Sequence, residues 1–182
     1  MLPLVRRRLQ MRPFSSKGGD GSDGVRGSAR TIEIAGVSAP LRPAQRPELV
    51  PRGFVDDLFA GAEGDAETLA TLRWMLQKDL LKQDIFLIGG PGPERRNLAQ
   101  AFAELVDREV EYVAISRDTT EADLKQRREL RAGSSVFADA PPVRAALKGR
   151  LLILDGIEKA ERNVLPTLNN LLENRDMVRM PC

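Results

Sequence analysis

Apolar residues from position 66 onward follow two patterns, short continuous runs and positions spaced three or four residues apart. Continuous runs rich in β-forming residues predict strands near 85–89, 111–116 and 151–155. Helical spacing predicts a helix over 94–106, with an apolar face made of Leu98, Ala101, Phe102 and Leu105. The same reasoning predicts further helices at 66–81, 125–131, 141–148 and 158–174.

From the strand at 85–89 onward these elements follow the order β-α-β-α-α-β-α, with helical segments between successive strands. Such crossovers require parallel strands joined by right-handed connections, so the predicted fold class is α/β with a parallel sheet. The run from Leu151 to Leu154 is apolar on both faces, as expected for a central strand covered by helices.

The first 65 residues have a different pattern. Thr31 to Ile34 alternates apolar and polar residues and predicts a short strand, and four prolines between 35 and 52 then exclude a long helix. The sequence therefore predicts four segments: a flexible, disordered N-terminus at 1–30, an extended connector at 31–65, a core at 66–177 and a short tail at 178–182.

Composition limits the chemistry that the chain can perform. Its 182 residues are 42% hydrophobic and 30% charged, which suits one globular α/β domain. There is no histidine, and the single cysteine is Cys182. Histidine catalysis, cysteine-based metal sites and an intrachain disulfide are thus excluded. The longest aliphatic run has four residues, which is too short to span a membrane.

Charge is distributed unevenly along the chain. Residues 1–30 hold seven bases and two acids, a net charge of +5, whereas 31–182 hold 21 bases and 24 acids, a net charge of −3. The first nineteen residues are Arg-rich, contain serine, lack acids and place Leu2, Val5 and Leu9 on one helical face, as in a mitochondrial transit peptide. A basic disordered arm is the alternative. We expect a location in the mitochondrial matrix, and the acidic body argues against nucleic acid as a partner.

A Gly/Pro-rich turn, Gly89-Gly90-Pro91-Gly92-Pro93, joins the first predicted strand to the helix at 94–106. A strand, a glycine turn and a helix N-terminus form the frame in which backbone N–H groups hold phosphate. The full signature is G-x-x-x-x-G-K-[ST], and counted from Gly89 its last three positions hold Glu94, Arg95 and Arg96. Residues 89–96 are therefore the candidate nucleotide-binding residues.

Each of these three exchanges weakens the case for Mg-ATP. Glu94 places a carboxylate where glycine would let the backbone approach phosphate. Arg95 keeps a cation at the lysine position with a different reach, and Arg96 lacks the hydroxyl that would bind Mg²⁺. We expect no ordinary ATP hydrolysis at this loop, although its glycines and arginines allow an anion to bind.

The third predicted strand ends in Asp155. In phosphate-loop ATPases such a strand ends in Asp-Glu, where Asp holds Mg²⁺ and Glu polarises the attacking water. Asp155 is thus the candidate metal ligand, but Gly156 follows it and the next carboxylate is Glu158. Asp155 and Glu158 are the candidate catalytic residues, and capping of a helix is the alternative role of Glu158.

A dinucleotide-binding loop is a weaker interpretation of the same turn. Gly90-Pro91-Gly92 matches only the G-x-G part of that fingerprint, and Arg95 stands where its third glycine belongs. Ser116 ends the second predicted strand, where an acidic residue would be needed to bind ribose.

Three stretches resemble the AAA+ family, in its dynein-related, MoxR and midasin group: LRWMLQKDLLKQDIFLIGGPGPERRNLA, EVEYVAISRDTTEADLKQRRELRAG and GRLLILDGIEKAERNVLPTLNNLLENRDM. The resemblance implies an incomplete three-layer AAA+ phosphate-loop core over 66–177. It implies ATP and Mg²⁺ as cofactors of the parent protein, a mitochondrial address, and other AAA+ modules or subunits of a ring as partners. It also implies a degenerate loop in the first module.

After Met177 the sequence departs from that group, which continues into a fourth strand. The group's strand order, 5-1-4-3-2, implies a gap between the first and third predicted strands, where unpaired backbone is costly. We therefore expect a truncated form without ATPase activity of its own. Two functions remain open: part of a mitochondrial AAA+ ATPase, or a non-catalytic scaffolding module that does not bind nucleotide.

Overall fold

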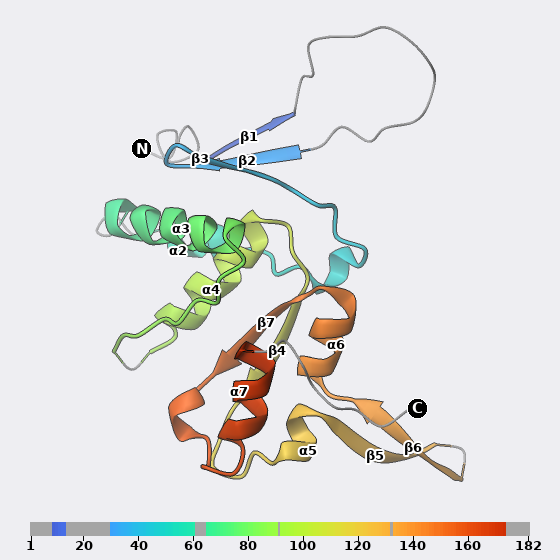
Figure 1. Cartoon of the computed structure of the whole chain (residues 1–182). Helices are drawn as coiled ribbons and strands as arrows, with labels where there is room; N and C mark the ends of the chain where they lie inside the picture. The colour runs from blue at the N-terminus through green and yellow to red at the C-terminus, as the bar shows by residue number, and fades with distance from the viewer. Residues whose placement is uncertain (1–8, 14–29, 61–64, 91, 132, 174–182) are drawn as a thin grey trace, which may run out of the picture. The chain divides into compact units, whose positions relative to one another are not determined.

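The chain divides into two compact units, Met1–Arg108 and Glu109–Cys182, and each is described by itself (Figure 1). The computed structural model describes residues 9–13, 30–60, 65–90, 92–131 and 133–173. Both units combine helices and strands, and two strands of the second unit are parallel, which confirms the predicted α/β class.

Unit 1 begins with an antiparallel sheet of order β1-β2-β3. Its strands are β1 Leu9–Pro13, β2 Arg30–Ile34 and β3 Val37–Pro40. Because Ile34 pairs with Val37, only Ala35 and Gly36 join β2 to β3, with φ of +45° and +86°. Positive φ at both central residues is what a type I′ hairpin turn requires. The strand predicted at 31–34 is confirmed, whereas the helical face predicted to include Leu9 is wrong at that residue; residues 1–8 and 14–29 lie outside the described part.

The helices of unit 1 pack on this sheet and on one another. They are η1 Pro47–Leu49, α2 Phe54–Leu58, α3 Asp65–Leu80 and α4 Glu94–Leu105. Strands β2 and β3 contact α3, and Ile32 and Ile34 are buried in the same unit as Leu72 and Leu76 of α3. The predicted helices at 66–81 and 94–106 are thus confirmed. Leu80, the last residue of α3, is 46% exposed. The connector predicted at 31–65 includes β2, β3, η1 and α2.

One side chain ties α4 to α2. Glu104 of α4 accepts hydrogen bonds from the backbone N–H groups of Gly53 and Val55, each 3.0 Å long, at the start of α2. Gly53 is in the left-handed conformation with φ of +88°. A carboxylate bound to the first N–H groups of a helix acts as its N-cap and complements the helix dipole. Glu104 therefore caps α2 from a distant part of the sequence.

Replacing Glu104 by alanine should release the N-terminus of α2. Loss of this cap costs about 1–2 kcal/mol, so the Gly53 and Val55 amides should exchange with solvent about tenfold faster. Hydrogen exchange followed by NMR measures this change, and Glu104→Gln, which keeps one acceptor oxygen, should show a smaller effect. Unchanged exchange in the alanine variant would mean that the carboxylate does not hold α2.

Unit 2 is built around two parallel strands. Its elements are β4 Val110–Ala114, α5 Glu121–Leu124, β5 Gln126–Arg131, β6 Ser134–Asp139, α6 Pro141–Lys148, β7 Leu151–Asp155, η2 Ile157–Lys159 and α7 Leu165–Glu173. Strands β4 and β7 pair in parallel, with Ala114 opposite Asp155. This confirms the two strands predicted at 111–116 and 151–155, and the helix predicted at 141–148 is confirmed as α6.

A small hydrophobic core covers one face of this strand pair. Val113 and Leu154 lie on the same face, because they are register partners. They pack against a buried cluster from the end of β4, α5 and the α7 region, made of Ile115, Leu124, Val164 and Leu168. Figure 1 shows α7 close to β4 and β7, and this packing fixes the ends of both strands.

The basic helix predicted at 125–131 is wrong, because this segment is strand β5 of a hairpin with β6. Gln126 donates to Asp139 at 2.8 Å, and Arg128 donates to Ser135 at 2.5 Å. Lys, Arg, Glu and Leu favour helices as single residues, but pairing with a neighbouring strand overrides so weak a preference. Gly133, expected to end a helix, follows β5 with φ of +80°.

The helix predicted at 158–174 begins only at Leu165, and the short helix η2 precedes it. Pro166 is the reason, because proline cannot donate to the carbonyl of the residue four positions earlier. A helix begun at 158 would break there, whereas proline in the first turn costs little.

The strand expected at 85–89 is not formed, because residues 83–89 carry no strand pairing. Ile85 and Leu87 are half-buried, whereas Phe86 is 66% and Ile88 83% exposed. An apolar run becomes a strand only where a neighbouring strand supplies hydrogen-bond partners. Within the described ranges no strand pairs with residues 85–89.

Candidate functional site

The candidate phosphate loop belongs to unit 1 and leads directly into α4. The first bond within this helix runs from the Asn97 N–H to the Pro93 carbonyl oxygen, at 2.8 Å. The N–H groups of 94–96 precede that bond, so they have no partner inside the helix. The predicted glycine turn and helix N-terminus are therefore present, although Pro91 lies outside the described residues and the preceding strand is not formed.

Glu94 turns its carboxylate back onto the glycine turn. A Cβ atom added to Gly92 would lie 2.9 Å from Glu94 Oε2, and Gly92 has a φ of +150° that side chains rarely adopt. The carboxylate therefore lies against the backbone that a phosphate would have to approach. Like charges at this range repel strongly, so the geometry opposes a bound phosphate.

The two arginines of the loop lie differently from each other. The stem of the half-buried Arg95 packs on Gly89, where an added Cβ would lie 3.4 Å from Arg95 Cδ. Arg96 is exposed, and no other described residue forms an ion pair with either arginine. With Glu94, the two cations give the start of α4 a net charge of +1 and no hydroxyl that could bind a metal.

Asp155 lies in unit 2, at the carboxyl end of β7. The Tyr112 hydroxyl of β4 donates a hydrogen bond to Asp155 Oδ2 at 2.6 Å. Both side chains project from one face, because Ala114 is the register partner of Asp155 and residues two apart in a strand share a face. Sequence reasoning missed Tyr112, since the register between two strands cannot be read from either strand alone. One oxygen of the candidate metal ligand is thus already engaged.

Gly156 occupies the position where an ATPase would carry its catalytic glutamate. It has a φ of +82°, and an added Cβ would lie 2.9 Å from the Ile115 carbonyl oxygen. This backbone conformation therefore excludes any side chain directly after Asp155. Glu158, the substitute candidate, is exposed in the first turn of η2 and caps no long helix, because α7 begins at Leu165.

These residues do not fit a bound Mg-ATP. The Glu94 carboxylate lies against Gly92 in the turn, and Arg96 stands where the metal-binding hydroxyl belongs. Asp155 already accepts a hydrogen bond from Tyr112. In the part of the chain that the structure describes, no three Asp, Glu, Cys or His side chains form a cluster suited to a metal ion. The loop and the pair Asp155 and Glu158 belong to different units, and each is described within its own unit.

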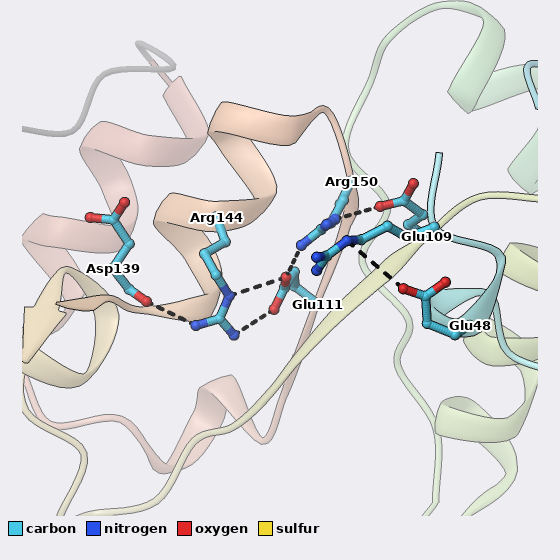
Figure 2. Close-up of polar contacts among 7 residues, drawn as sticks. Glu48, Glu109, Glu111, Asp139, Arg144 and Arg150 are labelled. Atoms are coloured by element: carbon cyan, nitrogen blue, oxygen red, sulfur yellow. Dashed lines mark hydrogen bonds and ion pairs between the residues drawn. The ribbon is translucent and has the colours of Figure 1, made fainter. Parts of the chain in front are cut away.

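Unit 2 also contains a buried ion network that the sequence did not reveal (Figure 2). Arg150 lies between two carboxylates, with Nε 2.5 Å from Glu109 Oε2 and Nη1 2.6 Å from Glu111 Oε1. Arg144 donates to both oxygens of Glu111, at 3.2 and 2.7 Å, and to the Asp139 carbonyl oxygen at 2.8 Å. The side chains of Arg150, Glu109 and Glu111 are only 8–9% exposed. The network joins β4 to α6 and to the start of β7.

Two members of this network, Glu111 and Arg150, are biased toward their ionised forms. Burial raises the pKa of Glu111, but hydrogen bonds and charge attraction from Arg144 and Arg150 outweigh it, so its pKa lies below the ordinary value. The hydrogen bond with Glu109, with Glu111 adding to it, raises the pKa of Arg150. Every charge has a partner, and removing one member of such a buried network is costly because it leaves charge without its counter-ion.

Similarity to known proteins covers the whole of this site. A family model described as AAA domain (dynein-related subfamily) matches residues 84–182, more than half of the chain. The von Willebrand factor A domain-containing protein 8 of Mus musculus is 52% identical over 182 residues, which cover 96% of this chain and 9% of that protein. Uncharacterized proteins of Staphylococcus aureus strains USA300 and NCTC 8325 are 29% identical over 106 residues, 56% of this chain and 40% of each relative. The chain thus spans less than half the length of these relatives.

Proposed function

The chain belongs to the dynein-related subfamily of AAA domains, and from this premise we propose that it is a non-catalytic module in the N-terminal part of a longer mitochondrial AAA+ ATPase. The family implies use of nucleotide and Mg²⁺. In this proposal other modules bind and hydrolyse ATP, and this one takes part in assembling the ring. The observation that carries the proposal is the Glu94 carboxylate, which lies against Gly92 where phosphate would bind.

Two further observations support a non-catalytic role. Gly156 is the position directly after Asp155, where an ATPase carries its catalytic glutamate. A side chain at this position would lie too close to the Ile115 carbonyl oxygen. Asp155 itself accepts a hydrogen bond from Tyr112, so it is held as part of the strand pair. Both the binding and the hydrolytic half of an ATPase site are therefore altered, each in its own unit.

The mitochondrial part of the proposal rests on the N-terminal sequence. Its first nineteen residues include four arginines, a lysine and the serines at positions 15 and 16, and they contain no acid. This composition is typical of a transit peptide. The partners we propose are other AAA+ modules, and none of the described helices is long and apolar enough to cross a membrane.

Restoring the loop tests the proposal. Glu94→Gly, Arg95→Lys and Arg96→Thr together should create a saturable Mg-ATP site at the loop that the unchanged chain lacks, because they remove the carboxylate and supply the lysine and hydroxyl of the signature. Fluorescent-nucleotide titration measures this difference. As a control, the single change Arg96→Thr should not create this loop site, since Glu94 remains. Equal binding by the unchanged chain and the triple variant would contradict the proposal.

A second function, a nucleotide-binding loop that still works, is favoured by one observation. The N–H groups of 94–96 have no partner within the helix, and Arg95 and Arg96 provide positive charge beside them. This alternative requires the Glu94 carboxylate to move away from Gly92 when nucleotide binds.

A further inference from the structure

A groove with a volume of about 680 Å³ lies in unit 2, lined by segments that directly follow its two parallel strands. One wall comes from Arg117, just after β4. The ends of β4 and β7 lie together here, because the Ile115 N–H donates to the Asp155 carbonyl oxygen at 2.7 Å. The other wall comes from residues 158–163, just after β7. In parallel α/β sheets, ligands bind outside the carboxyl ends of the strands. The groove is therefore placed where such folds hold their ligands.

The lining is rich in charges that lack partners. Its polar side chains are Arg117, Lys159, Arg162, Glu158, Glu161 and Asn163. All of them are exposed, and no described residue forms an ion pair or a side-chain hydrogen bond with them. This contrasts with Arg144 and Arg150 in the same unit, whose charges are fully paired. Three cations against two carboxylates leave the groove with a net charge of +1.

Lys159 lies beside the residue that follows β7. A Cβ added to Gly156 would be 3.4 Å from Lys159 Cδ and 3.6 Å from Nζ, which are ordinary contact distances. The ammonium group therefore lies near the end of β7, within the lining of the groove.

We propose that this groove binds the phosphoryl group of a small anionic ligand. Guanidinium groups offer forked N–H donors that match phosphoryl oxygens, and lysine adds a point charge. Glu158 and Glu161 oppose the anion, so removing them should strengthen binding, which distinguishes a phosphoryl site from an ordinary solvated surface. The site shares no residue with the loop at 89–96, so its test is independent of the proposed function.

Isothermal titration of the full chain with sodium tripolyphosphate, without metal and at low ionic strength, tests this proposal. The titrations use an Arg95→Gln/Arg96→Gln background, so that the loop cannot contribute. Arg117→Gln/Arg162→Gln should weaken binding at least tenfold, because two charge-assisted hydrogen-bond donors are lost. Glu158→Gln/Glu161→Gln should tighten binding several-fold. Lys148→Gln, which removes an exposed cation outside the groove, should change nothing.

ATP and adenosine distinguish the sources of the phosphoryl group. Equal affinity for ATP and tripolyphosphate supports a free phosphate ligand, and tighter binding of ATP supports a nucleotide. Far-UV circular dichroism checks that each variant is folded, and the single variants Arg117→Gln and Arg162→Gln replace the double one if it is not. The proposal is overturned by absence of saturable tripolyphosphate binding, by binding that the groove variants leave unchanged, or by binding of adenosine in place of the phosphate.

Discussion

Replacing Arg150 by methionine should destabilise unit 2 by about 3–5 kcal/mol, because the change leaves two buried carboxylates without their shared cation. The Arg150 side chain is 8% exposed and bonds to both Glu109 and Glu111. Methionine has a similar volume, so the loss comes from the missing cation and its hydrogen bonds and not from a cavity. Urea unfolding followed by circular dichroism measures the difference.

Two further variants separate charge from packing in this experiment. Arg144→Met should cost only about 1–2 kcal/mol, because Arg144 is 45% exposed and Glu111 keeps Arg150. The combined variant Glu109→Gln, Glu111→Gln, Arg150→Met should recover much of the loss, since no buried charge remains. A loss below 1 kcal/mol for Arg150→Met alone would contradict this account of the network.

The network also sets a pH dependence. Because Arg144 and Arg150 lower the pKa of Glu111, the folded chain binds a proton there less readily than the unfolded chain. Its contribution is complete above the ordinary pKa of glutamate, about 4.3, and is lost as the pH falls through the lowered pKa. The stability difference between the unchanged chain and Glu111→Gln should therefore shrink on acidification below that value.

Replacing Gly156 by alanine should cost about 3 kcal/mol or more, the second large effect that we expect. Left-handed φ alone costs a non-glycine residue about 1–2 kcal/mol, and a Cβ 2.9 Å from the Ile115 carbonyl oxygen adds a steric conflict with backbone. Gly149→Ala is the matched control, because Gly149 has a φ of +67° and open space around the added atom. That variant should lose only about 1–2 kcal/mol.

Thermal unfolding of the two alanine variants measures the loss of stability in each. Gly149→Ala reports backbone strain alone, and Gly156→Ala reports the same strain together with the steric clash. Equal losses would mean that the Ile115 carbonyl oxygen moves easily out of the way. The expected result has a functional consequence, because Gly156→Glu should then destabilise the unit without restoring an ATPase glutamate.

Sequence patterns predicted the elements that are determined locally. The apolar runs of β4 and β7 and the helical spacing of α3, α4 and α6 give the same answer as the structure, because burial on one face or both sets the period of each. The resemblance to the AAA+ group is confirmed by the family match over 84–182.

Features that depend on pairing between distant segments were not predictable in this way. The hairpin β5–β6 replaced an expected helix because strand partners decide the state of a polar segment, and the run at 85–89 lacks such a partner among the described residues. The hydrogen bond from Tyr112 to Asp155 requires the register of β4 against β7. The pairing of Arg150 with Glu109 and Glu111 likewise joins residues about 40 positions apart.

The most direct test of a non-catalytic module is titration of the purified 182-residue chain with Mg-ATP, with Arg95→Ala as the control. We predict no saturable binding that depends on the loop, so both proteins should give the same titration, because Glu94 lies against the backbone of Gly92 where phosphate would bind. Saturable binding by the unchanged chain that is lost in Arg95→Ala would contradict this prediction and show that the loop holds nucleotide.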